Sequence, residues 1–166
     1  DSPLGMVFLD MPNGYTKLQN RKHTQAEAGV KQAYKLTTYV SCPFEQSAAL
    51  GTYQYTEDAF ANEVPTFEVI AGATPDEVIF VDPMGHPSAW DIKVSVDVNT
   101  GIASIQRQKA WDTFFYGLPA NYGTATIGTD GSASFFFSCT GTINMSVKHD
   151  VDIGTYGFKA FKAQKL

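Results

Sequence analysis

The stretch Trp90–Gln108, WDIKVSVDVNTGIASIQRQ, decides the fold class of this chain. Its first half places apolar β-branched residues at every second position: Ile92, Val94, Val96 and Val98. Successive side chains of a strand point to opposite faces of a sheet, so this alternation predicts one buried and one exposed face. Asn99–Gly101 then supplies a short turn in which glycine can adopt a positive φ. The stretch therefore predicts a β-hairpin in which 102–108 returns along 92–98.

The chain on either side of this hairpin carries similar signals. Short segments rich in β-branched and aromatic residues alternate with turns at 35–41, 51–56, 66–71, 77–82, 122–127, 132–147 and 155–163. In the second of these, Tyr53 and Tyr55 fall on one face, and Gly141 marks a bulge or kink in the long 132–147 segment. About eight or nine strands without helical crossovers predict an all-β fold. The expected architecture is an antiparallel barrel, lipocalin- or calycin-like, or a β-sandwich.

The first 33 residues are the least regular part of the chain. Thr24–Glu27 has the form of a capping box, which favours a short helix, although a loop leading into a strand fits as well. No internal repeat, low-complexity tract or linker divides the 166 residues. We therefore expect a single all-β domain over 1–166, with 1–33 as an irregular segment packing on it.

Composition excludes two classes of function. The net charge is −5 and the lysines and arginines are scattered, whereas nucleic-acid binding needs a concentrated basic surface. No apolar run approaches the length of about 18 residues that a membrane-spanning helix needs. The chain begins at Asp1 without a signal peptide, from which we expect an amino terminus that is processed, trimmed or incomplete.

Cys42 and Cys139 are the two cysteines, and they lie far apart in the sequence. Two buried free thiols are the favoured interpretation, and a single disulfide is the alternative if the protein is exported. The three histidines lack a second ligand at the spacing that zinc sites use. The sequence therefore predicts no metal site and no cofactor.

Catalytic motifs are absent from the sequence. It contains no G-x-S-x-G and no phosphate-binding glycine loop. A Cys139–His149 pair is better interpreted as a core cysteine and an exposed histidine. The acidic groups Glu57–Asp58 with Glu63, and Asp150 with Asp152, are typical of solvated edges, and 97–101 is a hairpin turn rather than a calcium loop. We therefore expect no catalytic residues and no enzymatic activity.

The order of segments resembles a known family. It consists of GTYQYT at 51–56, the hairpin at 90–108, the glycine turn at 128–131 and the closing IGTYGFKAF at 153–161. Over 51–166 this order resembles the small all-β lipoproteins of Bacteroidetes encoded beside outer-membrane glycan-uptake (Sus-type) systems, some of them described as lipocalin-like or lipid-binding. The resemblance implies a non-catalytic accessory subunit or glycan-binding component, lipid-anchored at the outer-membrane surface beside the glycan transporter complex. Its alternative is a lipocalin-like carrier of an apolar small molecule or lipid.

Aromatic residues give the remaining signal, with twelve Phe, eight Tyr and two Trp. Five lie within expected strands and are predicted to be core: Phe135, Phe136, Phe137, Phe158 and Phe161. Six flank the hairpin or occupy the loop after it: Trp90, Trp111, Phe114, Phe115, Tyr116 and Tyr122. Flat aromatic faces beside polar groups suit a sugar ring or an apolar ligand, so these six are the candidate ligand-binding residues. The alternative is that they seal the barrel end or pack two sheets together.

Overall fold

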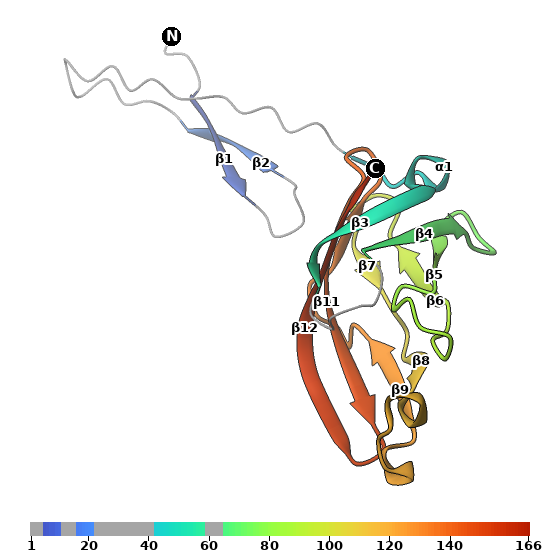
Figure 1. Ribbon diagram of the computed structural model, residues 1–166. Coiled ribbons are helices and arrows are strands. Elements are labelled where there is room, and N and C mark those ends of the chain that lie inside the picture. The colour runs from blue at the N-terminus through green and yellow to red at the C-terminus, as the bar shows by residue number, and fades with distance from the viewer. Residues whose placement is uncertain (1–4, 11–15, 22–41, 59–64) are drawn as a thin grey trace. The chain divides into compact units, whose positions relative to one another are not determined.

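The computed structural model describes residues 5–10, 16–21, 42–58 and 65–166, which belong to two compact units divided after residue 41 (Figure 1). The first unit contains an antiparallel hairpin of β1 (Gly5–Asp10) and β2 (Thr16–Arg21). This pairing differs from the irregular segment expected for 1–33, because the apolar run at 6–9 forms a strand. The helix predicted at Thr24–Glu27 and the strand predicted at 35–41 lie outside the described residues.

The second unit is one antiparallel sheet that curls into a half-barrel (Figure 1). The strand order is β7-β6-β5-β4-β3-β12-β11-β9-β8, with β10 paired to β11. The strands are β3 (Gly51–Asp58), β4 (Thr66–Ala71), β5 (Glu77–Val81), β6 (Ile92–Val96), β7 (Ala103–Ser104), β8 (Gln108–Asp112), β9 (Thr124–Gly128), β10 (Phe135–Phe137), β11 (Thr142–Val151) and β12 (Gly154–Lys165). The all-β antiparallel prediction is confirmed.

The two edge strands of this order, β7 and β8, are also paired through isolated β-bridges. Ile102, beside β7, pairs with Phe135 of β10, and Trp111 of β8 pairs with Ala89, which precedes β6. The edge strands of an open sheet would leave their backbone groups unpaired, and these bridges pair them instead. The curled sheet is therefore barrel-like rather than two separate layers.

The central hairpin forms, but its second strand is shorter than predicted. β6 and β7 pair through Ser95–Ser104 and Val96–Ala103 only. Beyond them the backbone of Ile105 exchanges hydrogen bonds with Thr129, and Gln108 begins β8, which pairs with β9. The prediction that the whole of 102–108 returns along 92–98 is therefore wrong. Only residues 103–104 pair with β6, and Gln108 already belongs to the separate pair of β8 and β9.

Turn chemistry explains why the chain reverses after β6. The carboxylate of Asp97 accepts hydrogen bonds from the amides of Asn99 (3.0 Å) and Thr100 (2.8 Å) and from the Thr100 hydroxyl (2.9 Å). Gly101 follows at a φ of +70°, which favours glycine. The interpretation of 97–101 as a hairpin turn is confirmed.

The long strand predicted over 132–147 is instead a second hairpin. β10 pairs antiparallel with the start of β11, with Phe136 opposite Ile143. The turn between them ends at Gly141, whose amide donates to the carbonyl of Ser138 (3.3 Å) at a φ of +62°. The glycine that was expected to kink one strand therefore reverses the chain between two.

Alternating side chains fill the interior of the half-barrel. In β6 the buried and exposed residues alternate along the whole strand, as the sequence predicts. We call the five contacting rings that are at least 96% buried the core ring cluster: Tyr53, Phe67, Phe80, Phe136 and Phe161. Phe44 and Tyr55 also contact these rings. Phe158, predicted to be core, is half exposed because it lies on the outer face of β12, and Phe135 and Phe137 are only partly buried.

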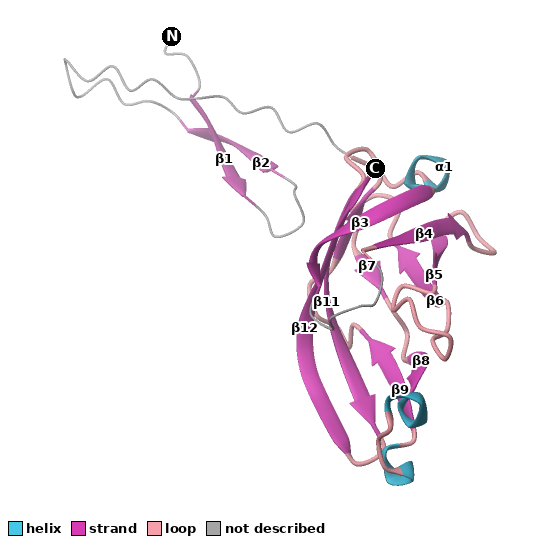
Figure 2. Ribbon diagram, in the orientation of Figure 1, coloured by secondary structure: helices cyan, strands magenta, loops and turns pink. Residues whose placement is uncertain are grey.

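Residues 42–50, which include α1 (Gln46–Ala49) and lead into β3, are fixed to one end of the half-barrel by a disulfide and by hydrogen bonds. Cys42 and Cys139 form a disulfide, so the favoured prediction of two free thiols is wrong. The Glu45 amide donates to Ser138 Oγ (2.9 Å), and Lys165 Nζ donates to the carbonyl of Ala48 (2.8 Å). The two 3-10 turns, η1 (Thr113–Tyr116) and η2 (Ala120–Tyr122), lie at the opposite end of the sheet (Figure 2).

Candidate binding site

Among the described residues, the two most exposed aromatic side chains, Phe114 and Phe115, lie on η1, directly after β8. Asp112 caps this turn through its Oδ1, which accepts from the amide of Phe114 (3.0 Å), and Gly117 ends it in the left-handed conformation. A single 3-10 turn has one buried side, and the buried Thr113 occupies it. The next three side chains therefore face solvent, with 73% of Phe114, 61% of Phe115 and 46% of Tyr116 exposed.

Neighbouring elements hold these rings in a group that we call the exposed ring cluster: His86, Trp111, Phe115, Tyr116 and Tyr156. The ring centroid of Tyr116 lies 4.5 Å from that of His86 and 5.2 Å from that of Trp111. Phe115 contacts the His86 ring edge-on at 5.3 Å, and Tyr156 lies 6.1 Å from Trp111. Three separate segments of the chain therefore meet in one aromatic surface.

The structure gathers only some of the six predicted ligand-binding residues. Trp111, Phe115 and Tyr116 meet in the cluster, and Phe114 lies beside them on η1. Trp90 is 39% exposed and contacts Lys109, whose Nζ lies 5.7 Å from the ring centroid. Tyr122 is half-buried in η2, where its carbonyl accepts from the amide of Asp152 (3.0 Å).

Sequence reasoning missed two members of the cluster, His86 and Tyr156. His86 belongs to a loop that carried only a turn signal, DPMGHP at 82–87. Tyr156 lies beside the irregularity where the register between β11 and β12 shifts. Neither contact has a local sequence signal, because each depends on how distant strands pair.

Trp111 connects this surface to the interior through His149. Its indole Nε1–H donates to His149 Nδ1 over 3.0 Å. His149 is fully buried, so the prediction of an exposed histidine is wrong. Burial, together with the positive charge of Arg107, lowers the pKa of His149 from 6.5 to about 4, while Asp150 opposes this shift. Cys139 is exposed and bonded to Cys42, so the interpretation of Cys139 as a core cysteine is wrong as well.

Charged groups beside His149 form an ion-pair group on the outer surface. Arg107 pairs with Asp130 and, over 2.7 Å, with Asp150, and Lys148 Nζ lies 3.4 Å from the Asp150 carboxylate. Two cations here balance two carboxylates. Within the part of the chain that the structure describes, no group of three or more His, Cys, Asp or Glu is arranged to hold a metal ion.

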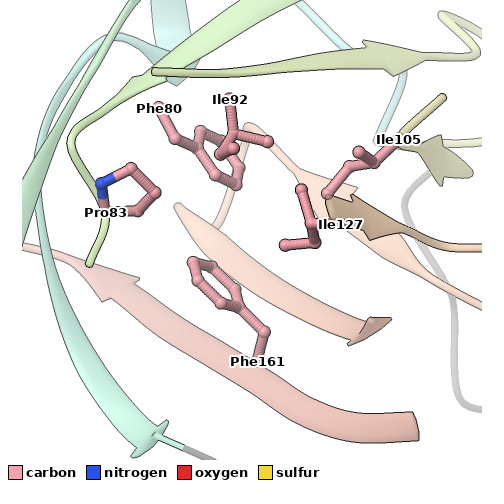
Figure 3. A pocket seen from close by; sticks show the side chains of 6 residues that line it. All are labelled: Phe80, Pro83, Ile92, Ile105, Ile127 and Phe161. Carbon is pink, nitrogen blue, oxygen red and sulfur yellow. The ribbon is translucent and has the colours of Figure 1, made fainter. Parts of the chain in front are cut away.

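One gap in the interior bears on the carrier alternative. Six side chains line it: Phe80, Pro83, Ile92, Ile105, Ile127 and Phe161 (Figure 3). These side chains approach so closely that the gap has no room for a water molecule. At this place the half-barrel is filled by its own core.

Comparison of the chain with models of protein families, with curated proteins and with solved structures finds no significant match. Among the described residues, no helix is both long and apolar enough to cross a membrane.

Proposed function

We propose that this protein is a non-catalytic glycan-binding protein, and that the exposed ring cluster with Phe114 is its binding surface. The observation that carries the proposal is the exposure of three consecutive aromatic side chains on η1, two of which other rings hold in place. Exposing large aromatic rings forgoes the stabilisation that burying them gives, and clusters of this kind commonly mark binding sites.

The chemistry of such a surface fits a sugar ring. A pyranose presents a face of C–H bonds that packs on the electron-rich face of an aromatic ring, while its hydroxyls need polar partners at the rim. Contacts with His86 and Trp111 hold the rings of Phe115 and Tyr116, so these two side chains lose little conformational entropy on binding. A rigid, exposed aromatic surface with polar neighbours therefore favours a glycan.

The setting that we propose is the outer-membrane surface, where a lipid-anchored protein would act beside a glycan transporter complex. The family resemblance over 51–166 supports this setting. The Cys42–Cys139 disulfide is compatible with it, because disulfides persist mainly in exported proteins. Within the second unit, α1 and the two 3-10 turns lie at opposite ends of the sheet (Figure 2). The alternative, a carrier of an apolar molecule in the barrel, gains no support from the filled gap of Figure 3.

Affinity gel electrophoresis tests the proposal. The full chain is run in gels that contain a β-glucan, a xylan, a mannan, glycogen or polygalacturonate. We expect at least one neutral polysaccharide to retard the wild-type protein, and the Phe114→Ala, Phe115→Ala double variant to lose that retardation. Phe158→Ala is the matched control, because this half-exposed ring lies on β12 outside the cluster and should leave retardation unchanged. Absence of retardation on every polysaccharide, or equal loss in both variants, would refute the proposal.

A further inference from the structure

The loop between β5 and β6 holds His86 in a fixed position. Asp82 Oδ1 accepts from the His86 amide (3.2 Å), and the Asp82 carbonyl accepts from the amide of Gly85 (3.0 Å). On the other side, the His86 carbonyl accepts from the amide of Ala89 (2.8 Å), and Met84 is buried beneath the loop. The backbone on both sides of His86 is therefore fixed by hydrogen bonds.

Ser88 determines which ring nitrogen of His86 carries the proton. The Ser88 amide lies 3.2 Å from His86 Nδ1, and the Ser88 hydroxyl lies 2.8 Å from the same atom. An amide N–H can only donate, so Nδ1 must accept. This contact assigns the proton of the neutral imidazole to Nε2.

The His86 ring lies at the centre of the exposed ring cluster. It stacks on Tyr116 at an interplanar angle of 29° and meets Phe115 edge-on at 82°. No residue within the described ranges bonds its Nε2, and the side chain is partly exposed. A hydrogen-bond donor of fixed tautomer therefore lies among exposed aromatic rings without an acceptor in the described part of the chain.

We infer that His86 is the specificity-determining polar residue of this surface, and that its Nε2–H donates to a hydroxyl or ring oxygen of a sugar packed against Phe115. This inference rests on the proposed function. It adds the one oriented polar contact that an aromatic surface lacks, since ring stacking alone tolerates many flat ligands.

Charge at the site indicates which class of glycan binds. The segments that carry the rings are anchored by two carboxylates, Asp82 in the His86 loop and Asp112 at the cap of η1. Lys109, the nearest lysine in sequence to η1, lies against Trp90. Two carboxylates in the segments that carry the rings disfavour an anionic ligand, so the ligand class is a neutral oligosaccharide rather than a uronate polymer.

Two variants of the full chain test the role of His86. His86→Phe keeps an aromatic ring against Tyr116 but has no N–H. Phe158→Ala is the matched control, because this half-exposed ring of β12 lies outside the exposed ring cluster. Titration calorimetry uses cellotetraose, xylotetraose, mannotetraose, maltotetraose and tetragalacturonate as probes. We expect His86→Phe to raise the Kd of the neutral probe that binds the wild type by about tenfold, and Phe158→Ala to change it by less than about twofold.

A nitrogen-15 NMR spectrum of the His86 ring gives a readout that needs no variant. We expect the pattern of an Nε2-protonated ring, with the Nε2 resonance moving when the neutral probe is added. A ring protonated on Nδ1, an unmoved Nε2 resonance, or wild-type affinity in His86→Phe would overturn the inference. If the wild type binds and the Phe114→Ala, Phe115→Ala variant does not, while His86→Phe binds normally, only this inference fails. If the wild type binds no probe and no polysaccharide, the proposed function fails with it.

Discussion

The protein contains two groups of contacting aromatic rings that differ in exposure but little in geometry. Neighbouring ring centroids lie 5.2 Å apart for Phe67 and Phe80 in the core ring cluster, and equally 5.2 Å apart for Trp111 and Tyr116 in the exposed ring cluster. Every ring of the core cluster is at least 96% buried, whereas 61% of Phe115 is exposed. Ring contact alone therefore does not distinguish a packing role from a binding role.

The difference originates in local backbone structure. Core rings such as Tyr53 and Phe161 lie on β-strands, where alternation sends them to the inner face. Phe115 and Tyr116 lie on a 3-10 turn whose single buried position is taken by Thr113. Trp111 belongs to both regions, because it is half-buried against the core and bonds His149 while it also contacts Tyr116. We therefore expect changes in the core to alter stability and changes on η1 to alter binding.

The largest effect is expected inside the barrel. Val94→Asp places an unpaired carboxylate at a fully buried position of β6, at a cost of several kcal/mol, roughly the whole stability of a small domain. Ser95→Asp is the matched control, since the next residue of the same strand is exposed. Circular dichroism should show an unfolded Val94→Asp protein and a folded Ser95→Asp protein. Equal stability of the two would contradict the assigned inner face.

The disulfide should have the next largest effect. It joins residues separated by 97 positions, and loss of a bridge that closes a loop of this size costs roughly 2–5 kcal/mol. The Cys42→Ala, Cys139→Ala double variant should therefore unfold at lower urea concentration than the wild type. Wild-type protein treated with reductant should shift by the same amount, and an unchanged midpoint in both samples would show that the bridge contributes nothing.

His149 should make stability depend on pH. Its pKa falls from 6.5 in the unfolded chain to about 4 in the fold, so between these values the unfolded state binds more protons than the folded state. Stability is therefore complete above about pH 6.5 and declines as the pH falls toward about 4, by about 3 kcal/mol in total.

The measurement is urea unfolding at a series of pH values across this window. His149→Asn, whose amide oxygen can still accept from Trp111, should lower stability at neutral pH but flatten the pH dependence. If His149→Asn keeps the wild-type slope, another group is responsible for the pH dependence.

Sequence reasoning predicted those parts of the fold that local periodicity determines. The alternation correctly placed Val94 and Val96 inside, and turn residues correctly located the reversal at 97–101. Val98, expected on the same buried face, is instead 40% exposed because β6 ends at Val96. Sequence reasoning failed where one segment has two possible strand partners and its own residues favour neither. The segment 102–108 has good strand residues throughout, yet Ile105 bonds Thr129, the residue that follows β9, instead of extending the pairing with β6.

The candidate site was predicted only in part, for the same physical reason. The composition of 111–116 indicated an aromatic surface, and η1 carries one. The contribution of His86 could not be predicted from the sequence. His86 lies in a loop and Tyr116 in a 3-10 turn 30 positions later, and the pairing of distant strands brings the two rings together. The burial of His149 likewise follows from the register between β11 and β12. Its neighbours in sequence, Lys148 and Asp150, are charged and therefore gave no signal of a buried position.

Phe115→Ala is expected to have the smallest effect on stability. It also tests most directly whether the exposed ring cluster binds a ligand. Because 61% of this ring is exposed, the variant should unfold within about 0.5 kcal/mol of the wild type. On the same sample, titration calorimetry with the neutral oligosaccharide that the wild type binds should give a Kd raised about tenfold. An unchanged Kd, or a loss of stability of several kcal/mol like that of Val94→Asp, would contradict the assignment of the exposed ring cluster to binding.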